Sequence, residues 1–166
     1  IFAGILLLFK HKLSELSPDG SDEVLIKQKV MPKIEIDTII WVGEGNKTVD
    51  VQGIQDRFKS LGIQVEWRKL KEIQDYRNKI EHYYATVSYG SIQKMISNSF
   101  IVIVDFIRKY LNEDPRNLLG HETYDLMRSI DEVYEADKVI CLEKLKSLSF
   151  FKDIFFSMGR QQISSC

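Results

Sequence analysis

Apolar residues recur every three or four positions along most of this chain, which is the spacing of a helix that packs one face against a core. The clearest stripe predicts a helix over about residues 66–87, with apolar positions Ile73, Tyr76, Ile80, Tyr83 and Val87. An apolar opening run and three further stripes predict helices over about residues 1–16, 50–60, 91–111 and 122–148. Asp50 is the expected N-cap of the second of these helices. Pro115 and Gly120 bound an expected loop.

Residues 24–47 do not follow the helical spacing. Residues alternate as in a strand at Ile34, Ile36, Thr38, Ile40 and Val42. The apolar run 39–42 interrupts this alternation, and the segment Gly43–Asn46 has the composition of a turn. We therefore expect an irregular insertion or a short hairpin in this region. The fold predicted for the whole chain is all-α, an antiparallel bundle of about five helices with short connections.

The length of 166 residues suits a single helical domain over residues 1–166. Residues 112–166 are expected to form a C-terminal helical extension of it. The chain opens inside the apolar run 1–9 and lacks an initial methionine. This run is shorter than the ~20 residues that span a bilayer, and it lacks the charged start and cleavage site of a signal peptide. We interpret it as part of a core helix, and the chain as a fragment of a longer protein.

The charge and cysteine content narrow the possible functions. A net charge of -1 and a pI of about 6.4 argue against a broad, sequence-independent grip on duplex nucleic acid. A small basic site remains compatible with these values. The two cysteines, Cys141 and Cys166, form no CxxC pair, which indicates a reduced chain without a disulfide framework or a zinc site. We expect a cytoplasmic location, no membrane association and no cofactor.

Residues 77–84 are the part of the sequence that says most about chemistry. They place Arg77, Asn78, His82 and Tyr84 within about two turns of one predicted helix. A histidine can take the proton of a ribose 2′-hydroxyl or give one to the leaving 5′-oxygen, because its pKa lies near neutrality. An arginine stabilises the charge that develops on the phosphoryl oxygens. Together they suit metal-independent cleavage of RNA, whereas DNA lacks the attacking hydroxyl.

The helical geometry separates these two groups. Arg77 lies at the edge of the apolar stripe, whereas Asn78 and His82 share a polar face with Asp75 and Lys79. At about 100° per residue, Arg77 and His82 lie about 140° apart around the helix axis. A two-fold dimer that places this helix against its copy would line one cleft with both groups. Two plainer interpretations stay open, in which His82 is a surface residue and Arg77 only forms an i,i+4 pair worth ~0.3 kcal/mol.

The segment Arg77–His82 resembles the signature of the HEPN superfamily, in which an arginine and a polar residue precede a histidine by a few positions. Tyr84, two residues after His82, is similar to the extended form of the motif in HepT-type toxins. The resemblance covers about residues 1–111. It implies a metal-independent endoribonuclease that cleaves single-stranded RNA as a homodimer, in a toxin–antitoxin or phage-defence role. It also implies a nucleotidyltransferase antitoxin as partner.

Carried over residue by residue, the resemblance implies two catalytic and two supporting residues. His82 would be the proton-transfer group and Arg77 the phosphate stabiliser. Asn78 would support them, and Tyr84 would line the site or be modified by the nucleotidyltransferase. A second match, Arg116–His121, is discounted because Pro115 and Gly120 place it in a loop or at a helix start.

Two other functions compete with the ribonuclease. The first is a catalytically inactive HEPN module that dimerises or binds a nucleotidyltransferase. The mildly acidic net charge favours it. The nearest basic cluster, Arg68, Lys69 and Lys71, also favours it, because it lies about two turns before Arg77 and adds little to phosphate binding at the motif. The second is a helical dimerisation domain without any relation to the motif.

Overall fold

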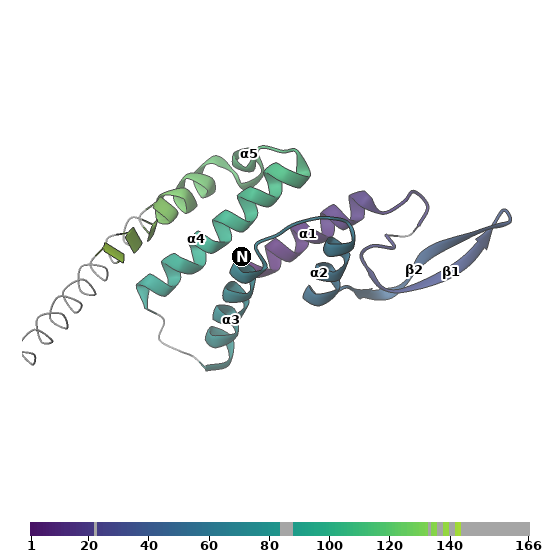
Figure 1. The fold of residues 1–166 in the computed structure, drawn as a ribbon, viewed down its shortest axis with the longest axis horizontal. Helices are drawn as coiled ribbons and strands as arrows, with labels where there is room; N and C mark the ends of the chain where they lie inside the picture. The colour runs from purple at the N-terminus through teal and green to yellow at the C-terminus, as the bar shows by residue number, and fades with distance from the viewer. Residues whose placement is uncertain (22, 84–87, 133, 136–137, 140–141, 144–166) are drawn as a thin grey trace, which may run out of the picture.

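The computed structural model describes residues 1–21, 23–83, 88–132, 134–135, 138–139 and 142–143. Most of them are helical, and the helices pack side by side with the hairpin at one end (Figure 1). The elements in chain order are α1 (Phe2–Leu16), β1 (Lys27–Glu35), β2 (Thr38–Thr48), α2 (Val51–Ser60), α3 (Trp67–Tyr83), α4 (Tyr89–Phe106), η1 (Ile107–Leu111) and α5 (Pro115–Leu119). Residues 121–132 are also helical.

The prediction of an all-α fold is wrong, because β1 and β2 form a two-stranded antiparallel sheet. The strands are joined by a two-residue turn at Ile36 and Asp37, whose φ angles are 44° and 60°. Such left-handed turns match the twist of antiparallel strands. The predicted turn at Gly43–Asn46 is also wrong, since these residues belong to β2. There the register shifts between Lys27 and Lys29, which is a bulge rather than a chain reversal.

The core lies where α1, α2, α3 and α4 meet, around three fully or almost fully buried phenylalanines. The ring centroids of Phe9 and Phe106 are 4.6 Å apart, and those of Phe9 and Phe58 are 5.3 Å apart. Phe58 and Phe106 stack nearly parallel at 5.7 Å. Trp67, at the start of α3, packs against Phe9 and Phe58. One side chain from each of four elements thus holds the helices together.

The helix predictions agree closely with the structure in the first two thirds of the chain. Asp50 caps α2 as expected, and its carboxylate accepts a hydrogen bond from the backbone N–H of Gly53 at 2.9 Å. The predicted helix 91–111 is α4 followed by the short π-helix η1. The predicted loop after Pro115 instead contains α5, because proline fits the first turn of a helix and Asp114 caps it. Predictions for residues 144–166 lie outside the described residues.

Arg57 connects α2 to the base of the hairpin. Its guanidinium donates one hydrogen bond to the carbonyl of Leu25 and a second, 2.7 Å long, to the carbonyl of Lys27. Burial lowers the pKa of this guanidinium. Lys27 is the first residue of β1, so this contact helps to set where the hairpin begins.

Within the part of the chain that the structure describes, no helix combines the length and the apolar character that crossing a membrane requires.

Candidate functional site

The predicted site residues lie in the second half of α3, where this helix extends beyond the core. Leu70 and Ile73 are buried in the first half of the helix. Ile80 belongs to the same predicted apolar stripe, yet it is 43% exposed. The stripe therefore leaves the core about two turns before the helix ends. Arg77, Ile80 and His82 in this half of α3 are therefore exposed.

Arg77 lies on the side of α3 that faces α1. Its guanidinium carbon is 5.8 Å from the ring centroid of Phe2, and its Nε donates a hydrogen bond to the Glu81 carboxylate at 2.8 Å. Half of its side chain is exposed. In the single chain, Arg77 is thus paired in the i,i+4 manner that the sequence allowed as a plainer interpretation.

His82 lies on another side of the same helix, exposed in its last turn. Asn78 precedes it by one turn and is partly buried. Because Arg77 and His82 are five positions apart, they point about 140° away from each other. The fold brings Asn78 and His82 to one face and leaves Arg77 off it. Tyr84, the remaining predicted site residue, lies outside the described residues.

A groove of about 280 Å³ runs between α3 and α4 on the His82 side of α3. We call it the α3–α4 groove, and it is lined by Glu72, Asp75, Tyr76, Lys79, Ser91, Lys94, Met95 and Asn98. Asp75 and Lys79 share the polar face of α3 with His82. The groove therefore lies on the same face of α3 as His82, although His82 does not line it. The sequence analysis had placed Asp75 and Lys79 on this polar face of α3. It did not predict the residues that α4 contributes to the groove. No local pattern shows which face of α4 meets α3.

Glu72 organises the polar contacts inside the α3–α4 groove. Its carboxylate accepts hydrogen bonds from Lys94 at 2.9 Å and from the buried Asn98 at 3.0 Å. The bond from Lys94 is the largest cause of a lowered pKa for Glu72. The Tyr76 hydroxyl is buried, has no hydrogen-bond partner among the described residues, and burial raises its pKa. The groove therefore has an ion pair between its two walls and an unsatisfied hydroxyl on its α3 wall.

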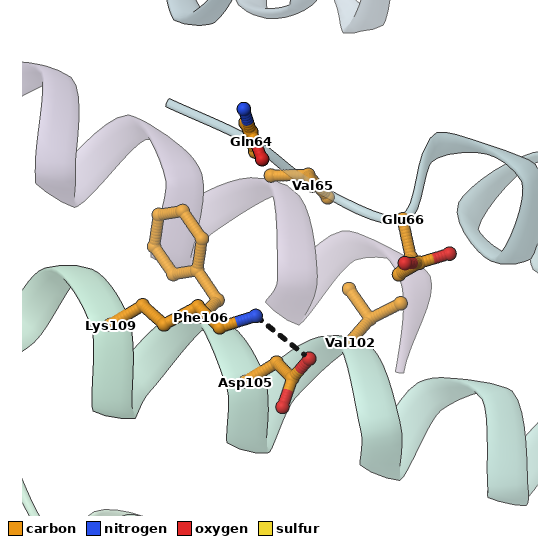
Figure 2. Close-up of a pocket in the computed structure, with 7 residues that line it drawn as sticks. All are labelled: Gln64, Val65, Glu66, Val102, Asp105, Phe106 and Lys109. Atoms are coloured by element: carbon orange, nitrogen blue, oxygen red, sulfur yellow. Dashed lines mark hydrogen bonds and ion pairs between the residues drawn. The ribbon is translucent and has the colours of Figure 1, made fainter. Parts of the chain in front are cut away.

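Neither Arg77 nor His82 lines the α3–α4 groove or three further hollows in the described part of the chain. The small hollow in Figure 2, of about 160 Å³, lies between the α2–α3 connection and α4. Lys109 there pairs with Asp105 at 3.2 Å, one helical turn away. The largest of these four hollows, of about 810 Å³, lies at the hairpin and is lined mainly by apolar side chains.

The second motif match, Arg116–His121, is not part of one helix. Gly120 interrupts it with a φ of 81°, between α5 and the helical residues 121–132. Arg116 is paired with Asp125 at 2.6 Å. The structure thus confirms the reason for discounting this match.

Among the described residues, no three His, Cys, Asp or Glu side chains come together in a way that could hold a metal ion. No family model, no curated protein and no solved structure matches this chain. None of these comparisons tests the resemblance to the HEPN superfamily, which is a resemblance of the motif residues alone.

Proposed function

We propose that this chain is a subunit of an endoribonuclease that cleaves single-stranded RNA by the metal-independent reaction, with a site completed by a second copy. The observation that carries the proposal is the uncovered second half of α3. It presents Arg77 and His82 to solvent, together with Ile80, an apolar residue that the core leaves 43% exposed.

A second copy supplies what the single chain lacks. Asn78 lies on the face of α3 between Arg77 and His82, about 100° from the first and 40° from the second. A copy packed on this face brings another arginine and another histidine beside the first pair. One groove is then lined by two of each, and a phosphodiester in it can contact a guanidinium and an imidazole at once.

The Arg77–Glu81 pair does not prevent this role. Both side chains are about half exposed, and exposed i,i+4 pairs on helices are worth only about 0.3–0.5 kcal/mol. A charge-assisted contact between a guanidinium and a phosphate is stronger than that, particularly when it is bidentate. RNA binding can therefore draw Arg77 away from Glu81 at little cost.

The test compares variants of this chain on labelled single-stranded RNA in EDTA, with a DNA oligonucleotide of the same sequence alongside. We expect the parent to cut RNA only and to leave cyclic phosphate ends. His82→Ala and Arg77→Ala should each lose roughly 100-fold or more, the lower end of a general acid–base contribution. Arg68→Ala is the matched control, because Arg68 is an exposed arginine of α3 that also pairs with the glutamate four residues on. Equal cutting by His82→Ala and the parent would refute the nuclease.

A catalytically inactive helical module is the second candidate. The pairing of Arg77 within its own chain favours it, as does the lack of either motif residue around the four hollows described above. In that case the parent and His82→Ala leave RNA intact but show the same mass in sedimentation. A nucleotidyltransferase partner and a toxin–antitoxin role follow from the resemblance alone. Modification of Tyr84 by such a partner would be visible as a mass increase of its peptide.

A further inference from the structure

The largest of the four hollows takes no part in the proposed cleavage of RNA. We call it the hairpin hollow. It lies where the end of α1, the connection from α1 to β1, the hairpin and the end of α2 come together (Figure 1). Its volume of about 810 Å³ is within the range of about 300–1,000 Å³ that is usual for small-molecule sites. Most of its lining is aliphatic, with one aromatic ring: Leu16, Val24, Leu25, Val30, Ile40, Leu61 and Trp41. Such a lining suits a ligand with an apolar body.

Hydrogen bonds between distant segments tie the walls of the hairpin hollow together. The N–H of Gly43 in β2 donates to the carbonyl of Ser21 at 3.4 Å, which joins the α1–β1 connection to the hairpin. The N–H of Leu25 donates to the hydroxyl of Ser17 at 3.2 Å. Arg57 adds its two hydrogen bonds from α2 to backbone carbonyls at the base of the hairpin. Because the walls are already fixed to one another, a ligand does not have to order them on binding.

One charged group of the lining lacks a counter-ion among the described residues. Arg57 is partly buried, and its guanidinium stays protonated at any physiological pH. It takes part in none of the ion pairs in the described part of the chain. A guanidinium has five N–H groups, and two hydrogen bonds from Arg57 to backbone carbonyls leave others available. Charges removed from water are normally paired. This guanidinium therefore suits a carboxylate, which accepts charge-assisted hydrogen bonds.

Two carboxylates also line the hairpin hollow, but neither of them pairs with Arg57. Asp19 lies in the α1–β1 connection, and Glu35 lies at the end of β1 next to the turn. Both residues are exposed, whereas Arg57 is partly buried. Because salt and water screen exposed charges more strongly than partly buried ones, Arg57 dominates the field that a bound head group meets. The hollow therefore favours an anionic head group over a cationic one.

We propose that the hairpin hollow binds a small carboxylate with an aliphatic chain. The chain contacts the leucine, valine and isoleucine side chains, and the head group accepts hydrogen bonds from Arg57. Trp41 is 57% exposed and lines the same hollow, so a bound chain covers part of its indole ring. This site goes beyond the proposed function and does not depend on it, because neither Arg77 nor His82 lines the hollow.

Calorimetric titration of the parent chain tests the head group. Decanoate, decanol and decylammonium have the same chain, and each is used below the concentration at which it forms micelles. Decanoate should bind roughly tenfold more tightly than decanol, because only decanoate offers an anion to Arg57. Decylammonium should bind more weakly than decanol, because its charge has the same sign as the guanidinium. Lack of decanoate binding would overturn the proposal, as would equal binding of decanoate and decylammonium. Binding of a peptide that ends in leucine, without binding of decanoate, would assign the hollow to a protein partner instead.

Substitutions at Leu61 test the role of Arg57 without removing its contacts to the hairpin. Leu61 is 43% exposed and follows Arg57 by one helical turn at the end of α2. Leu61→Glu places a carboxylate near the guanidinium as an internal counter-ion, and decanoate binding should weaken roughly tenfold. Leu61→Gln is the matched control, because it has nearly the same shape without the charge, and it should weaken binding much less. Equal affinities of the two variants would contradict Arg57 as the partner of the head group.

Tryptophan fluorescence tests where the ligand lies. Trp67→Phe leaves Trp41 as the single tryptophan of the chain. Decanoate should then shift the emission to shorter wavelengths, because its chain excludes water from the indole ring. Trp41→Phe is the matched control, since it keeps only Trp67, which packs against Phe9 and Phe58. A shift in the control alone would place the ligand elsewhere and overturn the proposal.

The ribonuclease assay separates this site from the proposed function. Leu61→Glu should cut RNA as the parent does, because Leu61 lies at the end of α2, outside the motif helix. His82→Ala should bind decanoate with unchanged affinity. Failure of decanoate binding therefore leaves the nuclease unaffected, and failure of RNA cutting leaves the ligand site unaffected.

Discussion

Arg57 provides the sharpest stability prediction, because one side chain links α2 to the start of the hairpin. It donates to the carbonyls of Leu25 and Lys27, which lie about thirty residues earlier in the chain. Arg57→Met keeps most of the aliphatic stem and removes both donors. We expect the base of the hairpin to loosen and the free energy of unfolding to fall.

The size of this loss can be bounded from the contacts. Hydrogen bonds from a charged donor contribute about 1.5–3 kcal/mol each, so two of them set an upper limit of about 3–6 kcal/mol. Arg57 is only partly buried. Water can therefore reach the freed carbonyls, and the cost of desolvating the guanidinium is recovered. We expect a net loss of about 2 kcal/mol, below the contact limit.

Urea denaturation followed by far-UV circular dichroism measures this loss. Lys59→Met is the matched control, because it removes one cation from the same last turn of α2 at an exposed position. It should change the free energy of unfolding by less than about 0.5 kcal/mol. Trypsin should also cut at the lysines of β1 faster in Arg57→Met than in the control. If the two variants unfold at the same urea concentration, the two carbonyl contacts do not hold the hairpin.

Three further predictions concern the core, a cap and an ion pair. Phe9→Ala should cost about 3–5 kcal/mol, because Phe9 is fully buried and packs against three other aromatic rings. Leu7→Ala on the same helix, at a position 67% exposed, should cost far less in the same thermal or urea unfolding series. Asp50→Ala should lower stability by about 1 kcal/mol, whereas Asp50→Asn should restore most of it, since asparagine also caps helices. Glu72→Gln should cost roughly 0.5–1 kcal/mol at pH 7. Because the folded-state pKa of Glu72 is lowered, its stabilising effect is present above the unfolded pKa, near 4.5, and is lost as the pH falls through the lower folded value. The gap between parent and Glu72→Gln should therefore close below about pH 4.5 in a pH series of unfolding curves. A gap that stays constant down to pH 3 would contradict this assignment.

The sequence by itself determined the local structure of most helices. The periodicity around Phe58 and the Asp50 cap suffice to predict α2, because both act within a few residues of chain. The same holds for the angular separation of Arg77 and His82, which follows from helix geometry alone. The motif and its candidate chemistry were likewise visible without coordinates.

Only the tertiary structure decided what surrounds these residues. Periodicity predicted that Ile80 would face a core, but its side chain is 43% exposed, since burial depends on where α3 leaves its neighbours. The α3–α4 groove joins Glu72 to Asn98, residues separated by 26 positions, and no local pattern encodes such a pairing. A short hairpin was among the predictions for residues 24–47, but its turn and its register were not, for the same reason. Its register is set by a turn at Ile36 and Asp37 and by the distant contact of Arg57, whereas sequence patterns report only the preferences of neighbouring residues.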